Sequence, residues 1–196
     1  LSVSSTITRN KISNPFGGNL TATNTFNGIY FTGNDGFAAL ENKVNNNLIY
    51  NITGSGDVYG IYNTSSDNVW YYHNTVVLDG SPATSTASSI VRGFYQKTLA
   101  DGIEFKNNII TISRAGLATK YCMYFATTTS TITSNNNNFN ITSTSGSNNI
   151  GFRTAAQATL ANWQAASLQD ANSITEDPLY ANAGGGDFTP TNAIVN

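Results

Sequence analysis

The sequence predicts an all-β solenoid in which short parallel strands stack coil upon coil. Two strand motifs recur with a period of about thirty residues: one is bent at asparagine, and the other has a bulky residue after a small one. Both motifs are rich in Ile, Val, Tyr, Phe and Thr with two-residue alternation. Helical solenoids with similar repeat lengths show a helical pattern, which this chain lacks almost everywhere, so stacked strands account for the period.

The first motif is an apolar strand interrupted by asparagine. Asn107 and Asn108 lie inside FKNNIITI at 105–112. Asparagine is depleted in strands, but it tolerates the left-handed backbone conformation and bonds its own backbone in turns. The same arrangement occurs at 45–52, 72–78 and 135–141. Alignment of these segments predicts that four residues share one corner of the coils: Asn47, Asn74, Asn108 and Asn138.

Asparagines at one corner should form a ladder. Coils stack at about 4.8 Å, which places equivalent side chains directly over one another. We therefore expect Asn108 to turn the chain between two faces of a coil and to bond the corner of the neighbouring coil.

The second motif occurs in five segments: NGIYF at 27–31, YGIYN at 59–63, RGFYQ at 92–96, CMYFA at 122–126 and IGFRT at 150–154. We expect the strands at 28–31, 60–63, 93–96 and 123–126 to stack in parallel and in register. In this alignment the inward residues are Ile29, Ile61, Phe94, Tyr124 and Phe152. The outward residues that follow them are Tyr30, Tyr62, Tyr95, Phe125 and Arg153.

The asparagine corners and GIY-type strands resemble the repeats of right-handed parallel β-helix proteins, the architecture shared by pectate lyases and many bacterial surface proteins. With this resemblance, we expect about five to six coils over residues 1–154. A capping segment with a short helix and a loop is expected over residues 155–196.

The closing stretch at 159–188 has features of a cap. Thr159 can serve as the N-cap of a helix in which Leu160, Trp163 and Ala166 fall near one face. An open solenoid end must be covered. Three later residues are expected to pack on the last coil: Leu179, Tyr180 and Phe188.

The same stretch, TLANWQAASLQDANSITEDPLYANAGGGDF, resembles the end of β-helix domains in large secreted surface proteins of the Bacteroidetes type. Such proteins are commonly exported by a carboxy-terminal sorting domain and displayed on the cell. The resemblance thus implies an extracellular or cell-surface location. The first residues already look like the middle of a repeat, so we expect the chain to be a piece of a longer protein whose targeting signals lie elsewhere.

Charge and hydropathy narrow the range of partners. The chain has 9 basic and 11 acidic residues, which gives no electrostatic footprint for nucleic acid or an anionic membrane. No stretch approaches the ~18 to 20 apolar residues that span a bilayer. The expected partners are extracellular polysaccharide or other surface proteins, with no nucleic acid, no membrane insertion and no cofactor. The single cysteine, Cys122, is interpreted as a small buried hydrophobic residue.

The acidic candidates are Asp67, Asp101 and Glu104. Both aspartates lie seven residues before a corner asparagine, so they should stack on neighbouring coils, while Glu104 and Lys106 should project outward from one strand. Such a column could bind calcium or act as an acid and base pair. The alternative, which we favour, is that the aspartates form Asx turns before strands, because Thr131 interrupts the column.

His73, the only histidine, precedes a corner asparagine and is interpreted as a partly exposed turn residue. It cannot make a metal site alone, and no metal site is predicted.

The glycan-binding candidates are aromatic: Tyr30, Tyr62, Tyr95, Trp70 and Tyr72. The first three should form an exposed ladder, and the last two should point outward from their own strand. Aromatic faces stacked against sugar rings are a usual way to bind polysaccharide, and exposed apolar patches mark binding sites. The alternative is structural, because aromatic residues favour strands and stack well between coils.

Taken together, these patterns predict a non-catalytic fragment of a secreted or cell-surface β-helix protein. It would serve as an adhesive or structural spacer module that can contact polysaccharide. The rival hypothesis is a polysaccharide lyase or glycoside hydrolase of β-helix fold, which would need an acidic groove and, usually, more coils than this chain provides.

Overall fold

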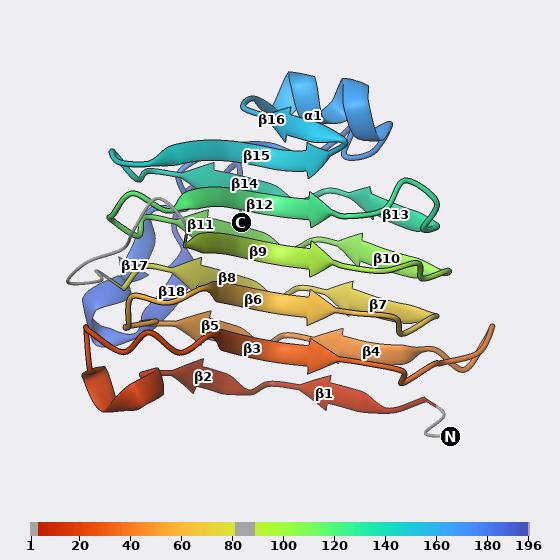
Figure 1. Ribbon diagram of the computed structural model, residues 1–196, viewed down its shortest axis with the longest axis horizontal. Coiled ribbons are helices and arrows are strands. Elements are labelled where there is room, and N and C mark those ends of the chain that lie inside the picture. Colours follow the sequence, from red (N-terminus) through yellow and green to blue (C-terminus); the bar gives the residue numbers. More distant parts are fainter. Residues whose placement is uncertain (1–3, 81–88, 196) are drawn as a thin grey trace.

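The computed structural model describes residues 4–80 and 89–195, and in this part of the chain the coils build three parallel sheets (Figure 1). Sheet A contains β1 (Thr6–Thr8), β4 (Asn42–Asn45), β7 (Val69–Tyr72), β10 (Ile103–Lys106) and β13 (Ile132–Asn135). Sheet B contains β2 (Lys11–Ser13), β5 (Leu48–Tyr50), β8 (Thr75–Leu78), β11 (Ile109–Ile112) and β14 (Asn138–Ile141). Sheet C contains β3 (Phe26–Phe31), β6 (Val58–Asn63), β9 (Ile90–Gln96), β12 (Thr119–Phe125) and β15 (Ser147–Arg153), followed by β16 (Ala155–Gln157).

The predicted fold class is confirmed. Each coil runs through sheet A, sheet B and sheet C in turn, and equivalent strands of successive coils pair in parallel. In Figure 1 the strands of sheet C run to the right in the foreground, sheets A and B return behind them, and the chain climbs from β1 to β15, which is a right-handed winding. The described residues thus form a β-helix of five coils, within the predicted range.

The core fills the space between the three sheets. On sheet B one inward column consists of Ile49, Val76, Ile110 and Phe139, all fully buried. Tyr71 and Phe105 of sheet A meet Phe94 of sheet C at ring-centroid distances of 5.2 Å and 4.7 Å respectively. Strand alternation thus places apolar side chains inside, where coil stacking joins them into one continuous core.

The corner between sheets A and B carries a hydrogen-bonded asparagine ladder. Asn74 donates its backbone N–H and its Nδ2 to Oδ1 of Asn108 at 2.9 Å and 3.0 Å, and its Nδ2 also donates to the Val44 carbonyl at 2.8 Å. The same pattern repeats along the corner at Asn10, Asn47, Asn74, Asn108 and Asn137. The ladder therefore satisfies buried backbone groups at the bend in each coil.

The prediction that Asn138 occupies this corner is wrong by one residue. Asn108 donates to Asn137 Oδ1 at 2.9 Å, whereas Asn138 is the first residue of β14 and pairs with Ile109. The run of four asparagines at 135–138 offers no single residue to align. The position is set instead by Phe139, which must enter the core beside Ile110.

The turn itself is made by the residue before each ladder asparagine. Asn46, His73, Asn107 and Asn136 have φ values of 57°, 55°, 57° and 56°. Asparagine is among the few residues that tolerate this left-handed conformation. The two asparagines of FKNNIITI thus have separate roles: Asn107 turns the chain, and Asn108 bonds the neighbouring coil.

The helix α1 (Leu160–Ser167) covers the last coil, at the top of Figure 1. Thr159 caps it by accepting the Asn162 N–H at 3.2 Å, and Trp163 is fully buried with its ring 5.0 Å from that of Phe125. Trp163 Nε1 donates to Asp170 at 2.8 Å. The buried Asp170 carboxylate also accepts bonds from Ser134, Asn137 and Ser173, so it ties the cap to the fifth coil.

The end of the chain lies elsewhere than predicted. After α1 it runs back along the outer surface of sheet B and forms β17 (Tyr180–Asn182), η2 (Ala183–Gly185) and β18 (Asp187–Pro190). Tyr180 bonds Thr111 of the fourth coil at 2.8 Å, and Phe188 packs on Tyr50 of the second coil at 5.1 Å. Leu179 is 56% exposed. These residues therefore cover the side of the solenoid, and α1 covers its end.

A single turn of 3₁₀ helix, η1 (Pro15–Gly18), links sheets B and C in the first coil. None of the helices among residues 4–80 and 89–195 has the length and apolarity to cross a bilayer.

Candidate functional site

Sheet C lies in the foreground of Figure 1. Its outer face carries a continuous column of aromatic rings. We call it the aromatic strip, and it consists of Tyr30, Tyr62, Tyr95, Tyr124 and Phe152. These residues align one coil apart through the parallel register of the five strands.

A break in strand alternation doubles the outward aromatic positions. In β6, Gly60 and Ile61 both face inward and are flanked by the partly exposed Tyr59 and Tyr62. A Cβ on Gly60 would lie 2.4 Å from Val76 Cγ1 and 2.7 Å from the Gly93 carbonyl, so the close approach requires glycine. The break creates a second outward column beside the strip. This second column includes Tyr59, Arg92 and Tyr121.

The sequence alignment was wrong by one residue in the last two coils. Tyr124 and Phe152 belong to the outward strip, whereas Phe125 points into the core and is 4% exposed. In the fourth coil Cys122 does align with Gly93, and Met123 rather than Tyr124 is the inward residue that pairs with Phe94. In the fifth coil Gly151 pairs with Met123, so it is not the equivalent of the small residue of the motif. A Cβ at Gly151 would lie 2.1 Å from Trp163 Cε3, so this glycine makes room for the cap.

Two pairs of neighbouring rings in the strip are stacked, whereas the planes of Tyr30 and Tyr62 are inclined by 36° and those of Tyr95 and Tyr124 by 88°. The Tyr62 and Tyr95 centroids are 4.7 Å apart with planes inclined by 13°, and those of Tyr124 and Phe152 are 4.4 Å apart with planes inclined by 5°. Tyr95 is only 8% exposed, whereas Tyr30, the first ring of the column, is 50% exposed. Within the strip, Tyr30 is therefore the ring best placed to offer a face to a ligand.

Arg92 lies among the aromatic rings on the outer face of sheet C. Its guanidinium carbon is 3.9 Å from the Tyr95 ring centroid and 3.7 Å from that of Tyr124, which are cation–π contacts.

The surroundings of two tyrosines on this face shift their pKa values in opposite directions. Burial raises the pKa of Tyr59 to about 12, and the nearby Asp57 carboxylate adds to this increase. The Thr64 hydroxyl donates a hydrogen bond to the Tyr30 hydroxyl oxygen at 3.2 Å, which lowers the pKa of Tyr30. Tyr59 therefore stays a neutral hydroxyl at physiological pH.

The predicted aromatic pair on sheet A also points outward. Trp70 and Tyr72 have stacked rings 5.6 Å apart, and Lys43 Nζ lies 5.5 Å from the Trp70 ring. Glu104 accepts hydrogen bonds from the Tyr72 hydroxyl and from Lys106 Nζ, the latter at 2.8 Å.

The Glu104 cluster is poorly suited to general acid catalysis. Partial burial raises the pKa of Glu104, but the hydrogen bonds from Lys106 and Tyr72 outweigh this effect and lower it. Burial and the contact with Glu104 raise the pKa of Tyr72. At neutral pH the carboxyl is thus ionised, and the phenol keeps its proton.

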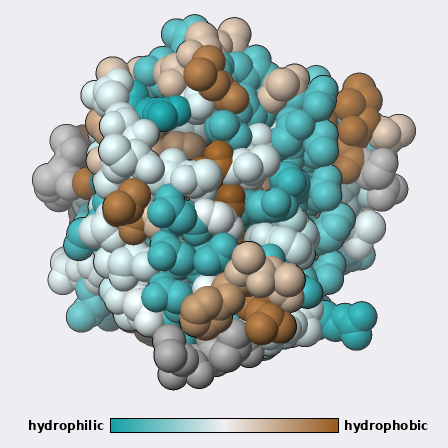
Figure 2. Space-filling view, turned by 90° about the vertical axis from the view of Figure 1, so that its right-hand side faces the viewer, coloured by the Kyte–Doolittle hydropathy of each residue, from teal (hydrophilic) through white to brown (hydrophobic). Residues whose placement is uncertain are grey.

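The two predicted aspartates, Asp67 and Asp101, stack on neighbouring coils as expected, and a third aspartate, Asp35, precedes them. Asp35 accepts the Asp67 N–H at 3.0 Å, Asp67 accepts the Asp101 N–H at 2.8 Å, and Asp101 accepts the Thr131 hydroxyl at 2.7 Å. These bonds join neighbouring coils, so the aspartates form a ladder between coils and not the local Asx turns that we favoured from the sequence. The column lies where sheet C turns toward sheet A, and Figure 2 shows that hydrophilic residues cover most of this end of the coils.

The structure gives no catalytic role to the histidine or the cysteine. His73 is an exposed turn residue, and Cys122 is fully buried, which raises the pKa of its thiol. Among residues 4–80 and 89–195, no three His, Cys, Asp or Glu side chains are grouped so that they could hold a metal ion.

Comparison of the chain with protein-family models, curated proteins and solved structures gives no significant match. Interpretation of its function thus rests on the geometry of its surfaces.

Several outward residues of sheet C, in the aromatic strip and in the column beside it, were not predicted from the sequence: Tyr59, Arg92, Tyr121, Tyr124 and Phe152. The spacing of tyrosines three residues apart, in YGIY at 59–62 and YCMY at 121–124, was the signal that could have revealed both columns.

Proposed function

We propose that this chain is a non-catalytic module of a secreted or cell-surface β-helix protein, and that it acts as an adhesive or spacer element that contacts an extended polysaccharide. The observation that carries the proposal is the aromatic strip, which runs unbroken across all five coils. An extended polymer can follow such a strip, because its contacts repeat at the coil spacing of about 4.8 Å.

The stacked rings set the mode of contact. Tyr30, which is 50% exposed, would stack on a sugar ring, and sugar hydroxyls would bond the phenols of the strip that reach solvent. The neutral Tyr59 hydroxyl donates to Asp57 Oδ2 at 3.1 Å, so it can accept a hydrogen bond from a sugar hydroxyl. The low net charge of the chain favours a neutral or weakly acidic polymer. Binding should depend only weakly on salt.

The acidic candidates support binding without cleavage. The carboxylates of Asp67 and Asp101 are engaged in hydrogen bonds to the next coil, and Glu104 is held ionised by Lys106. Hydrolysis requires a second carboxyl that carries a proton at the working pH. The engaged carboxylates thus favour an adhesive or spacer role over a lyase or hydrolase.

A glycan array, followed by titration of the ligands found, tests the proposal. We expect Tyr30→Ala and Tyr62→Ala to weaken binding about 3- to 10-fold, as expected for loss of one aromatic contact. Phe37→Ala is the matched control, because Phe37 is 47% exposed but lies outside the strip. Equal loss in the control, or no binding to any glycan, would leave only the spacer role. Release of new reducing ends or unsaturated products would instead establish an enzyme.

A further inference from the structure

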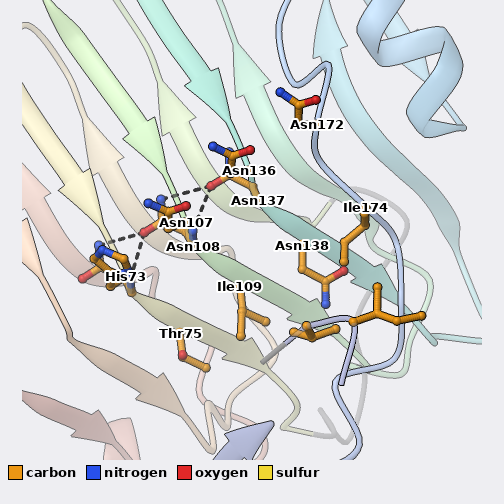
Figure 3. A pocket seen from close by; sticks show the side chains of 13 residues that line it. His73, Thr75, Asn107, Asn108, Ile109, Asn136, Asn137, Asn138, Asn172 and Ile174 are labelled. Atoms are coloured by element: carbon orange, nitrogen blue, oxygen red, sulfur yellow. Dashed lines mark hydrogen bonds between the residues drawn. The ribbon is translucent and has the colours of Figure 1, made fainter. Parts of the chain in front are cut away.

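A trough runs along the solenoid beside the asparagine corner, on a different surface from the aromatic strip. It consists of two adjoining cavities of ≈530 Å³ and ≈350 Å³ that share His73 and Thr75. Volumes of ~300–1,000 Å³ are usual for small-molecule sites. The larger cavity, shown in Figure 3, lies against the third to fifth coils, and the smaller one continues toward the first. The trough therefore has the shape of a site for an extended ligand.

One wall of the trough consists of the left-handed turn residues Asn46, His73, Asn107 and Asn136. Figure 3 shows the last three side chains in a row beside the buried ladder. The ladder asparagines use their amides in hydrogen bonds to one another and to backbone groups, whereas Asn107 and Asn136 are exposed, and their amides have no hydrogen-bond partner among the described residues. The wall thus presents amide groups that can donate and accept hydrogen bonds, repeated at the coil spacing of about 4.8 Å.

The opposite wall is largely apolar and comes from the end of the chain. Ile174, Ile194 and Val195 line the larger cavity together with Asn172, and Phe188 and Pro190 line the smaller one. At the floor, Asn138 is 3% exposed, and its buried Oδ1 has no hydrogen-bond partner. Figure 3 places its amide beside Ile174. This acceptor can be satisfied by a hydroxyl or amide donor that enters the cavity and displaces the Ile174 side chain.

Charge limits the class of ligand. Among residues 4–80 and 89–195, His73 is the only titratable side chain that lines the larger cavity, and the smaller one adds Lys11 and Asp187, which have opposite charges. A wall of neutral amides facing a wall of aliphatic groups matches a sugar, whose ring has hydroxyls at its edge and C–H groups on its face.

We propose that the trough is a second glycan site, which binds a neutral oligosaccharide segment through Asn107 and Asn136. The proposal takes its ligand class from the proposed function but concerns a separate surface. A module with two glycan sites on different faces can hold two polymer chains together, which is a physical basis for adhesion.

The single histidine makes the experiment specific to this site. The full chain is titrated at one fixed pH with soluble neutral oligosaccharides of glucose, xylose and N-acetylglucosamine, while the NMR signals of the His73 ring and of the tyrosine rings are followed. We expect at least one oligosaccharide to shift the His73 signals in a saturable manner. Tyr62→Ala should leave this shift unchanged, since Tyr62 belongs to the aromatic strip.

Variants at the turn residues supply the matched comparison. Asn107→Gly and Asn136→Gly remove the amide but suit the left-handed backbone, so both variants should fold. Each should weaken the binding detected at His73 about 5-fold, as expected for loss of one or two hydrogen bonds. The control is Asn51→Gly, which makes the same change at φ 52° outside the trough.

Two results would overturn the trough proposal. One is an unshifted His73 signal with every oligosaccharide; if tyrosine signals still move, the proposed function survives and only the second site is lost. The other is an equal loss of affinity in Asn51→Gly and Asn107→Gly.

Discussion

Replacement of Asn108 by leucine tests the asparagine ladder at its centre. The side chain is 1% exposed, and its Nδ2 donates to the carbonyls of Tyr71 and Lys106 at 2.8 Å and 3.0 Å and to Asn137 Oδ1 at 3.2 Å. Its Oδ1 accepts the backbone N–H and the Nδ2 of Asn74. Leucine has a similar volume, so the substitution removes these five bonds without opening a large cavity.

The expected cost follows from the groups left without partners. The Asn74 N–H loses its acceptor in a buried corner, which costs about 1–3 kcal/mol. Loss of the bond to the Tyr71 carbonyl adds about 1 kcal/mol. The free energy of unfolding should therefore fall by about 2–4 kcal/mol. For a chain of this length this corresponds to a decrease in Tm of roughly 4–16 °C.

Thermal and urea unfolding followed by circular dichroism measure the change. Asn27→Leu is the matched control, because Asn27 is exposed on β3 and its side chain makes no hydrogen bond to the described residues. This substitution should change the free energy of unfolding by no more than about 0.5 kcal/mol. An Asn108→Leu protein that unfolds at the wild-type midpoint would show that the ladder does not stabilise the fold.

The same assay tests the position of the ladder in the fifth coil. The Asn137 side chain donates to the Phe105 carbonyl and to Asp170 and accepts from the Asn108 N–H, whereas the Asn138 side chain donates to the Glu176 carbonyl. Asn137→Leu should thus destabilise the protein more than Asn138→Leu. The opposite order would refute the register described above.

Three further substitutions test the cap and the surface of sheet A. Gly151→Ala places a Cβ 2.1 Å from Trp163 and should cost about 1–3 kcal/mol in urea unfolding, whereas Gly184→Ala has open space and should be nearly neutral. Asp170→Asn replaces one accepting oxygen with a donor and should cost about 2–4 kcal/mol; an unchanged midpoint would contradict its role in the cap. Glu104 has a lowered pKa, so its stabilisation is present above the unfolded-state pKa of about 4.3 and is lost as the pH falls through the folded-state value. Glu104→Gln should therefore cost about 0.5–1 kcal/mol at pH 7 and nothing at pH 3, and an equal cost at both would rule out the ion pair as the cause.

The sequence by itself determined which side of most strands faces the core. Two-residue alternation assigned Trp70 and Tyr72 to the outside, and the structure places them there, with Val69 and Tyr71 of the same strand buried. The asparagine period likewise located the corner and the repeat. Such information is local, because facing within a strand depends only on the pleat of that strand and a turn depends on the conformations its residues tolerate.

Only the tertiary structure decided the offset between coils where loops vary in length. Asn137 rather than Asn138 joins the ladder because Phe139 must fill the core, and Gly151 is small because Trp163 packs on it. The ring planes of the aromatic strip and the wall of the trough built by residues 172–195 are also contacts between coils or between distant segments. Backbone pairing and packing between residues in different coils, or between a coil and the segment that covers it, set these features, and no local pattern encodes them.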